Sequence, residues 1–313
     1  MKLSKLTKQY IDLKQSMGSG FQAEAVILKA FSKALGDIDI MEVGDNQVLK
    51  YISGTGHVTC FWHRKYGTLS GFYRFAIGRG YTIHSPLPKT LPRPSRSFTP
   101  YIYPTEELRR LLETAKQFGT SRTKLQSLTV YTLILLLYGA GLRISEALSL
   151  KIRDVNLSDS FIVIRKSKFY KTRLVPVGLH LTNVLKTYAK EQNYNSDSNK
   201  NCTFFTTRHG EPVKRSTAEN AFRRIRKAAN VFRDDGARYQ PRLHDLRHSF
   251  AVHRLVTWYR QGADVQRLLP LLSTYLGHIH IAATQKYLTM TSELLQEANV
   301  RFEKYACSEG DIL

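Results

Sequence analysis

Residues 128–150 read LTVYTLILLLYGAGLRISEALSL, and this stretch decides how the larger part of the chain folds. Its first half, up to Tyr138, is almost entirely apolar, and a helix that is apolar on every side must be buried. Gly139 and Gly141 end that helix, because glycine adopts the left-handed conformation of a helix C-terminus without strain. A short second helix follows at once. Arg143 is therefore expected at a helix N-terminus, in a tight junction behind a core helix.

Hydrophobic periodicity predicts helices on both sides of this stretch, and two β-branched runs, 161–165 and 173–177, predict the strands of one hairpin. Lys168 would lie at the turn of the hairpin, and Asp45 is a candidate N-cap. We expect helices at residues 21–35, 45–52, 57–77, 105–112, 128–138, 144–150, 181–192, 216–229, 244–260, 264–276, 282–288 and 292–305. The expected fold class is mostly α with a small β-hairpin or sheet (α+β).

Residues 84–104 read HSPLPKTLPRPSRSFTPYIYP, and the repeated prolines exclude a helix or a central strand. Prolines separated by Ser, Thr, Lys and Arg are typical of an extended, basic linker. We therefore expect a helical domain at 1–83, a linker at 84–104 and a larger domain at 105–313.

The chain of 313 residues carries a formal net charge of +22. Such an excess of Lys and Arg favours a polyanionic partner, because neutralising backbone phosphates releases counterions. A basic protein without such a partner, or one that binds acidic membranes, is the alternative. The longest apolar run, 128–141, is too short to span a bilayer, and the N-terminus has no apolar core of signal-peptide length.

The three cysteines, Cys60, Cys202 and Cys307, lie far apart in the sequence. Their odd number and wide spacing argue for a reducing compartment and against both a disulfide framework and a zinc site. We expect neither a metal nor a cofactor.

Six side chains in the C-terminal two-thirds of the chain form a set that can cut and rejoin a phosphodiester without a metal: Arg143, Lys168, His244, Arg247, His278 and Tyr287. Planar guanidinium groups match the non-bridging oxygens of a phosphate, and a tyrosine can attack to give a covalent intermediate. A lysine can protonate the leaving sugar oxygen, and the histidines can deprotonate the tyrosine or hydrogen-bond the phosphate. Joining then needs no ATP, because the covalent step conserves the energy of the broken bond.

Each member of this set also has an ordinary interpretation. Arg143 could pair with a carboxylate, and Tyr287 is one of 17 tyrosines. Lys166 and Lys171 are rivals of Lys168, and a solvated turn explains all three lysines equally well. The order and spacing of the whole set are much more specific than any single residue.

The set resembles that of the tyrosine recombinases of the phage integrase family. GLRISE at 141–146 resembles the first arginine box of the family, and HDLRHSFA at 244–251 resembles the second. LGH at 276–278, with Tyr287 nine residues after the histidine, resembles the pair of third histidine and nucleophile. Glu146 falls where the family often carries a supporting acidic residue.

Lys168, ahead of TRLVP at 172–176, resembles the hairpin lysine, but KSKFYK at 166–171 lacks the glycines usual there. The segment between Asp264 and His278 is longer than the common pattern by about four residues, roughly one helical turn. Within it, Pro270 predicts a break or a kink in the helix.

The resemblance implies that residues 1–83 are a core-binding domain that clamps duplex DNA and that residues 105–313 are catalytic. Four protomers would assemble on two DNA sites, with helix 292–305 packing onto a neighbouring protomer or into its own core. Each tyrosine would form a 3′-phosphotyrosine and free a 5′-hydroxyl, and strand exchange would pass through a Holliday junction. The reaction would integrate, excise or resolve a mobile element or replicon in the cytoplasm of a prokaryotic cell.

Alternative hypotheses are a non-catalytic DNA-binding relative, a type IB topoisomerase-like activity and, more distantly, an RNA-binding protein. Basic residues interleaved with aromatics in the N-terminal helices, and a basic face on helix 216–229 that also includes Arg226 and Lys227, suit phosphate contacts. The candidate DNA-binding residues are Arg64, Lys65, Arg74, Arg79, Arg223 and Arg224.

Overall fold

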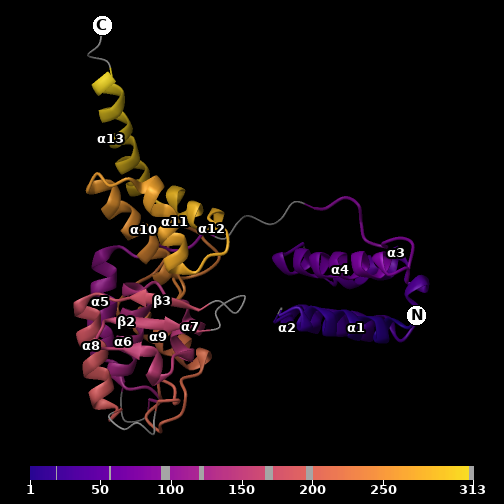
Figure 1. Ribbon diagram of the computed structural model, residues 1–313, viewed down its shortest axis with the longest axis horizontal. Coiled ribbons are helices and arrows are strands. Elements are labelled where there is room, and N and C mark those ends of the chain that lie inside the picture. The colour runs from indigo at the N-terminus through magenta and orange to yellow at the C-terminus, as the bar shows by residue number, and fades with distance from the viewer. Residues whose placement is uncertain are drawn as a thin grey trace. The chain divides into compact units, whose positions relative to one another are not determined.

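The computed structural model describes residues 1–18, 20–55, 58–92, 99–119, 123–165, 172–194 and 200–309. The chain divides into two compact units, Met1–Phe98 and Thr99–Leu313, whose elements are labelled in Figure 1. The division falls inside the expected linker 84–104, and both ends of that segment pack against a unit. Leu87 lies against the first core, and Tyr103 is fully buried in the second.

The first unit is helical. Its elements are α1 (Leu3–Ser16), α2 (Gln22–Leu35), the 3-10 helix η1 (Ile40–Glu42), α3 (Asp45–Ser53) and α4 (Cys60–Gly78). The last three α-helices match expected ones, whereas α1 adds a helix that we did not expect. Its buried residues Leu3, Leu6 and Tyr10 have the spacing of one helix face.

Two helix starts in this unit differ from the expectation. Asp45 is the first residue of α3 rather than its N-cap; Gly44 takes the cap position and its N–H donates to the Gln47 side chain at 3.0 Å. The helix α4 begins at Cys60 rather than at residue 57, because the Thr59 hydroxyl caps it there by accepting a hydrogen bond from a backbone N–H of the first turn.

The second unit combines helices with one small sheet, so the whole chain is mostly α with a small antiparallel sheet, as expected. Its helices are α5 (Thr105–Lys116), α6 (Ser127–Gly139), α7 (Ile144–Ser149), η2 (Ile152–Asp154), α8 (Leu179–Glu191), α9 (Arg215–Ala228), α10 (Asp245–Arg260), α11 (Val265–Leu276), α12 (Ala282–Gln285), η5 (Lys286–Thr289) and α13 (Ser292–Glu309). In Figure 1, α13 projects from the end of this unit beside α10.

The strands are β1 (Val155–Asn156), β2 (Phe161–Ile164) and β3 (Arg173–Pro176), and they pair antiparallel in the order β1-β2-β3. The expected hairpin is thus confirmed, with Ile164 opposite Arg173, and β1 extends it to a sheet. Lys168 and its rivals Lys166 and Lys171 lie outside the described residues.

The core of the second unit surrounds α6. Leu133, Leu136 and Leu137 are at most 1% exposed, and α6 contacts α5, α8 and α10. A helix enclosed by three others must be apolar on every side, which explains the sequence of this segment.

The helix α11 runs through Pro270 without the break that was one of the two outcomes we expected there. The Asp264 side chain caps its start, and Gly277, with a φ of 67°, ends it in the left-handed conformation. The N–H groups of Gly277 and His278 donate to carbonyls of the last turn, at 2.9 Å each, which is the Schellman pattern. Within the described residues, no helix is long and apolar enough to cross a membrane.

Candidate active site

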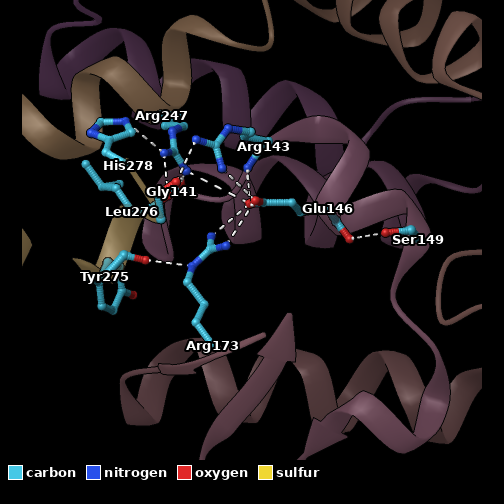
Figure 2. A network of polar contacts seen from close by, with 10 residues as sticks. Gly141, Arg143, Glu146, Ser149, Arg173, Arg247, Tyr275, Leu276 and His278 are labelled. Carbon is cyan, nitrogen blue, oxygen red and sulfur yellow. Dashed lines mark hydrogen bonds and ion pairs between the residues drawn. The ribbon is translucent and has the colours of Figure 1, made fainter. Parts of the chain in front are cut away.

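Three arginines from different elements meet at the C-terminus of α11, as Figure 2 shows. The last carbonyls of a helix lack partners within it and carry the negative end of its dipole, so cations stabilise them. The three bonds join Arg173 Nε to the oxygen of Tyr275 (2.9 Å), Arg247 Nη2 to that of Leu276 (2.6 Å), and Arg143 Nη2 to that of Gly277 (3.1 Å). The end of α11 therefore anchors three positive charges on consecutive backbone carbonyls.

Each arginine lies at the start of an element. Arg143 is the N-cap residue of α7, Arg173 is the first residue of β3, and Arg247 lies in the first turn of α10. The carbonyl of Gly141 also accepts a hydrogen bond from Arg247 Nη1 at 2.7 Å. With a φ of 59° at Gly141, the glycine-rich junction turns sharply enough to bring α7 and α10 to the same site.

Glu146, in the first turn of α7, is the counter-ion of this cluster. It accepts hydrogen bonds from the backbone N–H of Arg143 at 3.0 Å and from Arg143 Nη1 at 2.7 Å, and a bidentate pair from Arg173 at 3.0 and 2.9 Å. Burial alone would raise the pKa of Glu146, but the hydrogen bonds and charges of Arg173 and Arg143 outweigh it and lower the pKa to about 2. Three guanidinium groups around one carboxylate leave an excess of positive charge, which suits a phosphate.

Arg247 is almost completely enclosed, with 2% of its surface exposed. Burial, followed by the charge of Arg143, lowers the pKa of Arg247 to about 10, so its side chain stays protonated at neutral pH. Arg143 is the more accessible of the two, with 25% of its side chain exposed. The two arginines therefore present one shielded and one solvent-accessible guanidinium group to the same place.

Both ring nitrogens of His278 are engaged. Nε2 lies 3.1 Å from Arg247 Nη2, and Nδ1 lies 2.7 Å from the hydroxyl of Thr284. Because a guanidinium can only donate, Nε2 must accept and Nδ1 carries the proton. Burial and then the charge of Arg247 lower the pKa of His278 to about 4, which keeps the ring neutral at pH 7.

Tyr287 lies in η5, within the same cluster, and is 3% exposed. Its ring is stacked beside that of His278, with 6.1 Å between the centroids. Burial raises the pKa of the Tyr287 phenol, while the charge and hydrogen bonding of Arg247 act in the opposite direction. The phenol oxygen and the Arg247 guanidinium are therefore close enough to contact one phosphate together.

Two further histidines, His244 and His248, lie one helical turn apart at the start of α10. His244 occupies the N-cap position, and the rings of His244 and His248 meet edge to face with 4.9 Å between centroids. His248 Nδ1 lies 3.2 Å from the phenol oxygen of Tyr287. Burial is the main cause that lowers the pKa of each histidine to about 4. His244 therefore contacts His248, and His248 in turn contacts the phenol of Tyr287.

The structure brings together most of the side chains that the sequence singled out: Arg143, Glu146, His244, Arg247, His278 and Tyr287. Lys168 falls outside the described residues, so its placement stays a prediction. Sequence reasoning missed three contributors, namely Arg173, His248 and Thr284. Arg173 and His248 stand inside motifs that were read for other residues, so each was visible in the sequence without a role.

The DNA-binding candidates of the first unit differ in what they contact. Arg74 and Arg79 are exposed, whereas Arg64 forms an ion pair with Glu24 at 3.1 Å. Lys65 donates to a backbone carbonyl of α3 at 2.7 Å. The guanidinium of Arg79 also lies over the Phe75 ring, 5.6 Å from its centroid, so internal contacts involve three of these four side chains.

In the second unit, Arg223 and Arg224 are exposed on α9. Arg226, expected on the same basic face, is instead 5% exposed and donates to Val231 and Gln240 at 3.1 and 2.9 Å. Its guanidinium is buried near the C-terminal end of α9, so Arg226 is not part of the exposed basic face.

Comparison with known proteins agrees with the resemblance seen in the sequence. A model of the phage integrase family matches residues 103–293. The chain is 33% identical over 302 residues to "Putative integrase/recombinase y4rB" of Sinorhizobium fredii, which covers 95% of this chain and 96% of the relative. It is 30% identical over 243 residues to tyrosine recombinase XerC of Oceanobacillus iheyensis, which covers 76% and 72%.

Solved structures share the fold at lower identity. The Tn1549 transposon integrase, in complex with transposon right end DNA, aligns with a TM-score of 0.71 and 16% identity over 98% of this chain and 100% of that chain. The XerH site-specific recombinase, bound to a palindromic difH substrate, aligns with a TM-score of 0.63 and 23% identity over 91% and 80%. The fold of this chain is therefore that of the tyrosine recombinases.

Proposed function

The chain belongs to the phage integrase family and is a tyrosine recombinase, and on that premise we propose that its Tyr287 cuts and rejoins duplex DNA through a 3′-phosphotyrosine intermediate. The observation that carries this proposal is the position of Tyr287 beside a buried cluster of arginines. Arg143 and Arg247 hold fixed positive charge where the scissile phosphate would sit, and Glu146 keeps both side chains oriented.

The residues divide the chemistry between them. The phenol oxygen of Tyr287 attacks phosphorus, a new P–O bond forms to the tyrosine, and the bond from phosphorus to the 5′-oxygen breaks. Arg143 and Arg247 donate to the non-bridging oxygens as negative charge grows there, and His278, whose Nε2 accepts from Arg247, holds that guanidinium in place. We assign protonation of the leaving 5′-oxygen to Lys168, with Lys166 and Lys171 as rivals. Attack by the 5′-hydroxyl of a second strand reverses these steps and joins the strands.

The partner that we propose is duplex DNA, with four protomers assembled on two sites. The high positive charge supports DNA binding, and the exposed candidates Arg74, Arg79, Arg223 and Arg224 would contact phosphates without reading sequence. Contacts between protomers would involve α13, on which the apolar side chains of Phe302 (67%) and Val300 (48%) are exposed. Residues 1–98 would act as the core-binding domain. The proposed setting is a mobile element or replicon in a prokaryotic cell.

The proposal is tested with duplex DNA selected from a random-sequence library by binding to the full-length protein, then nicked near each candidate cleavage point. A covalent protein–DNA adduct should appear on a denaturing gel in buffer containing EDTA. Tyr287→Phe should abolish the adduct and leave DNA affinity unchanged.

Tyr275→Phe is the matched control, because Tyr275 gives the arginine cluster its backbone carbonyl, which the substitution keeps, while its hydroxyl donates to the carbonyl of Pro176 at 3.2 Å, away from the arginines. This variant should form the adduct at the rate of the unaltered protein. Persistence of the adduct in Tyr287→Phe would remove Tyr287 from its role.

A further inference from the structure

We propose that His248 is the group that takes the phenol proton of Tyr287 when this tyrosine attacks DNA. The inference rests on the proposed function of Tyr287 and adds a catalytic residue to it. Its starting point is the contact between His248 Nδ1 and the Tyr287 oxygen, at 3.2 Å, within the distance over which a proton can be transferred.

The helix α10 gives His248 this position. Successive residues of an α-helix point about 100° apart, so Arg247 and His248 face different neighbours from adjacent positions. Arg247 turns to the end of α11, where it binds the carbonyl of Leu276. His248 turns to η5, where its ring lies 5.6 Å from that of Tyr287, between centroids. One helix turn thus supplies a phosphate ligand and a proton acceptor to the same reaction.

Neither of the other two histidines of the cluster hydrogen-bonds the phenol oxygen of Tyr287 in the described structure. Both nitrogens of His278 have partners, Arg247 on one side and Thr284 on the other. The ring of His244 packs edge to face against the ring of His248, with 4.9 Å between centroids. Among the described residues, the imidazole nitrogen that hydrogen-bonds the phenol oxygen is Nδ1 of His248.

The charged and titratable groups around His248 favour a neutral ring in the free protein. Burial lowers the pKa of His248 to about 4, and the charges of Arg247 and Arg242 act in the same direction, while the His244 ring packs against it. A neutral ring accepts the phenol hydrogen bond at Nδ1 and carries its own proton on Nε2. Bound DNA adds phosphate charge beside the arginines, which raises the pKa of His248 and makes it a better proton acceptor.

As the phenol oxygen bonds to phosphorus, its proton passes to Nδ1 of His248, giving an imidazolium, and the 5′-oxygen leaves with a proton from the general acid. In the rejoining direction, the 5′-hydroxyl loses its proton to the group that acted as acid. The departing phenolate of Tyr287 then recovers its proton from His248. No metal, oxidant or nucleotide enters either direction.

A substrate with sulfur in place of the bridging 5′-oxygen separates this step from leaving-group protonation, because a thiolate leaves without a proton. The probe is the library-selected duplex with this phosphorothiolate at the cleaved position, compared with the ordinary duplex. We expect His248→Phe to slow adduct formation about 100-fold on both substrates. Variants of the general acid, in contrast, should recover on the sulfur substrate.

The pH dependence provides the signature of proton transfer. On the sulfur substrate, the rate of the unaltered protein should reach a plateau and stay flat up to pH 9, because the neutral ring of His248 accepts the proton along this plateau. In His248→Phe the rate should climb with pH as solvent hydroxide takes over the deprotonation. His248→Gln keeps a hydrogen-bond acceptor but cannot take a proton, so it should behave like His248→Phe. Recovery of the full rate in His248→Gln would reduce His248 to holding the phenol in place and overturn the proposal.

His253 offers a matched control on the same helix. Its Nδ1 lies 2.9 Å from the hydroxyl of Tyr138, a histidine–tyrosine pair of the same kind that is separate from the site. His253→Phe should form the adduct at the unaltered rate with a flat pH profile. If His248→Phe matched His253→Phe while Tyr287→Phe stayed inactive, the proposal for His248 would fall and that for Tyr287 would stand. If the unaltered protein formed no adduct, both would fall.

The free protein gives an independent check that does not depend on DNA or on catalytic activity. Nitrogen-15 NMR of labelled histidines distinguishes the two neutral tautomers. His248, assigned by its loss in His248→Phe, should carry its proton on Nε2. A proton on Nδ1 would leave no acceptor for the phenol and contradict the proposal.

Discussion

Glu146 shows how one buried side chain holds the site together. It bonds Arg143 and Arg173 and lies 4.0 Å from Arg247, so its charge offsets the mutual repulsion of three guanidinium groups. A buried carboxylate is costly on its own, and removing either side of such a pairing leaves uncompensated charge.

The substitution Glu146→Gln keeps the shape of the side chain and removes the charge. At pH 7 we expect it to lower the free energy of unfolding by about 3–5 kcal/mol. The folded pKa of about 2 is lower than the ordinary value of 4.5, so the stabilisation is complete above pH 4.5 and is lost as pH falls toward 2. Urea denaturation at several pH values should therefore show the gap between the two proteins closing in acid. A gap that stayed constant from pH 7 to pH 3 would contradict the role of the charge.

At the level of single residues, the sequence predicted the arginine boxes and the tyrosine because their spacing is unusual. It did not reveal Arg173, although β3 carries a signal. Leu174 is 62% exposed and Val175 is buried, so Arg173 shares the inner face of the strand with Val175. An inward-pointing arginine beside an outward leucine is visible only once the register of the hairpin is known. His248 stood in a quoted motif, but its partner lies 39 residues away.

The end of α11 is the element on which the site depends. Its last carbonyls hold the three arginines, and the junction at Gly141 lets α10 reach them. A Cβ atom at Gly141 would lie 2.5 Å from Phe250 Cδ1 and 3.1 Å from Leu276 Cδ2. Glycine at this position therefore allows α10, α11 and the end of α6 to approach each other closely.

Gly141→Ala should consequently destabilise the protein by about 1–3 kcal/mol more than the same change where space is open. Gly210 is the matched control, because it also has a positive φ, of 77°, and a Cβ there would meet no atom within 4 Å. Both variants share the cost of left-handed backbone, so the difference between their melting curves isolates the crowding. Equal melting temperatures would show that α10 can move away without loss.

Helices were predicted well where periodicity or capping is strong, as for α6 and α9, and the hairpin followed from its β-branched runs. The Lys-rich helix α1 was not recognised, since long polar side chains obscured the spacing of its buried leucines. For Pro270, the sequence predicted a helix break that the structure does not have. A proline predicts a helix break from local chemistry alone, but packing of Leu269 and Leu272 in the core keeps α11 continuous.

At the scale of the molecule, the protein has two compact units and a net charge of +22. A charge of this size favours binding to a polyanion such as DNA. Electrostatic affinity for DNA falls with salt by a slope of about −0.9 for each phosphate neutralised. If residues 1–98 contribute phosphate contacts, the affinity of the whole chain must depend on salt more steeply than that of the second unit alone.

A chain of residues 99–313 has its own core, including the buried Tyr103, and should keep its helical content. We expect it to bind the selected duplex more weakly, with a shallower plot of log affinity against log salt concentration. Fluorescence anisotropy between 50 and 300 mM salt measures both slopes, and circular dichroism confirms folding. Identical slopes would assign all phosphate contacts to the second unit.

The central claim, that Tyr287 is the nucleophile, is tested most directly by mass spectrometry of the covalent adduct. The adduct is trapped on the nicked duplex, digested with nuclease and trypsin, and sequenced by fragmentation. We predict a nucleotide attached through its 3′-phosphate to the phenol oxygen of Tyr287. Attachment to any other residue, or a 5′-phosphate linkage, would contradict the account.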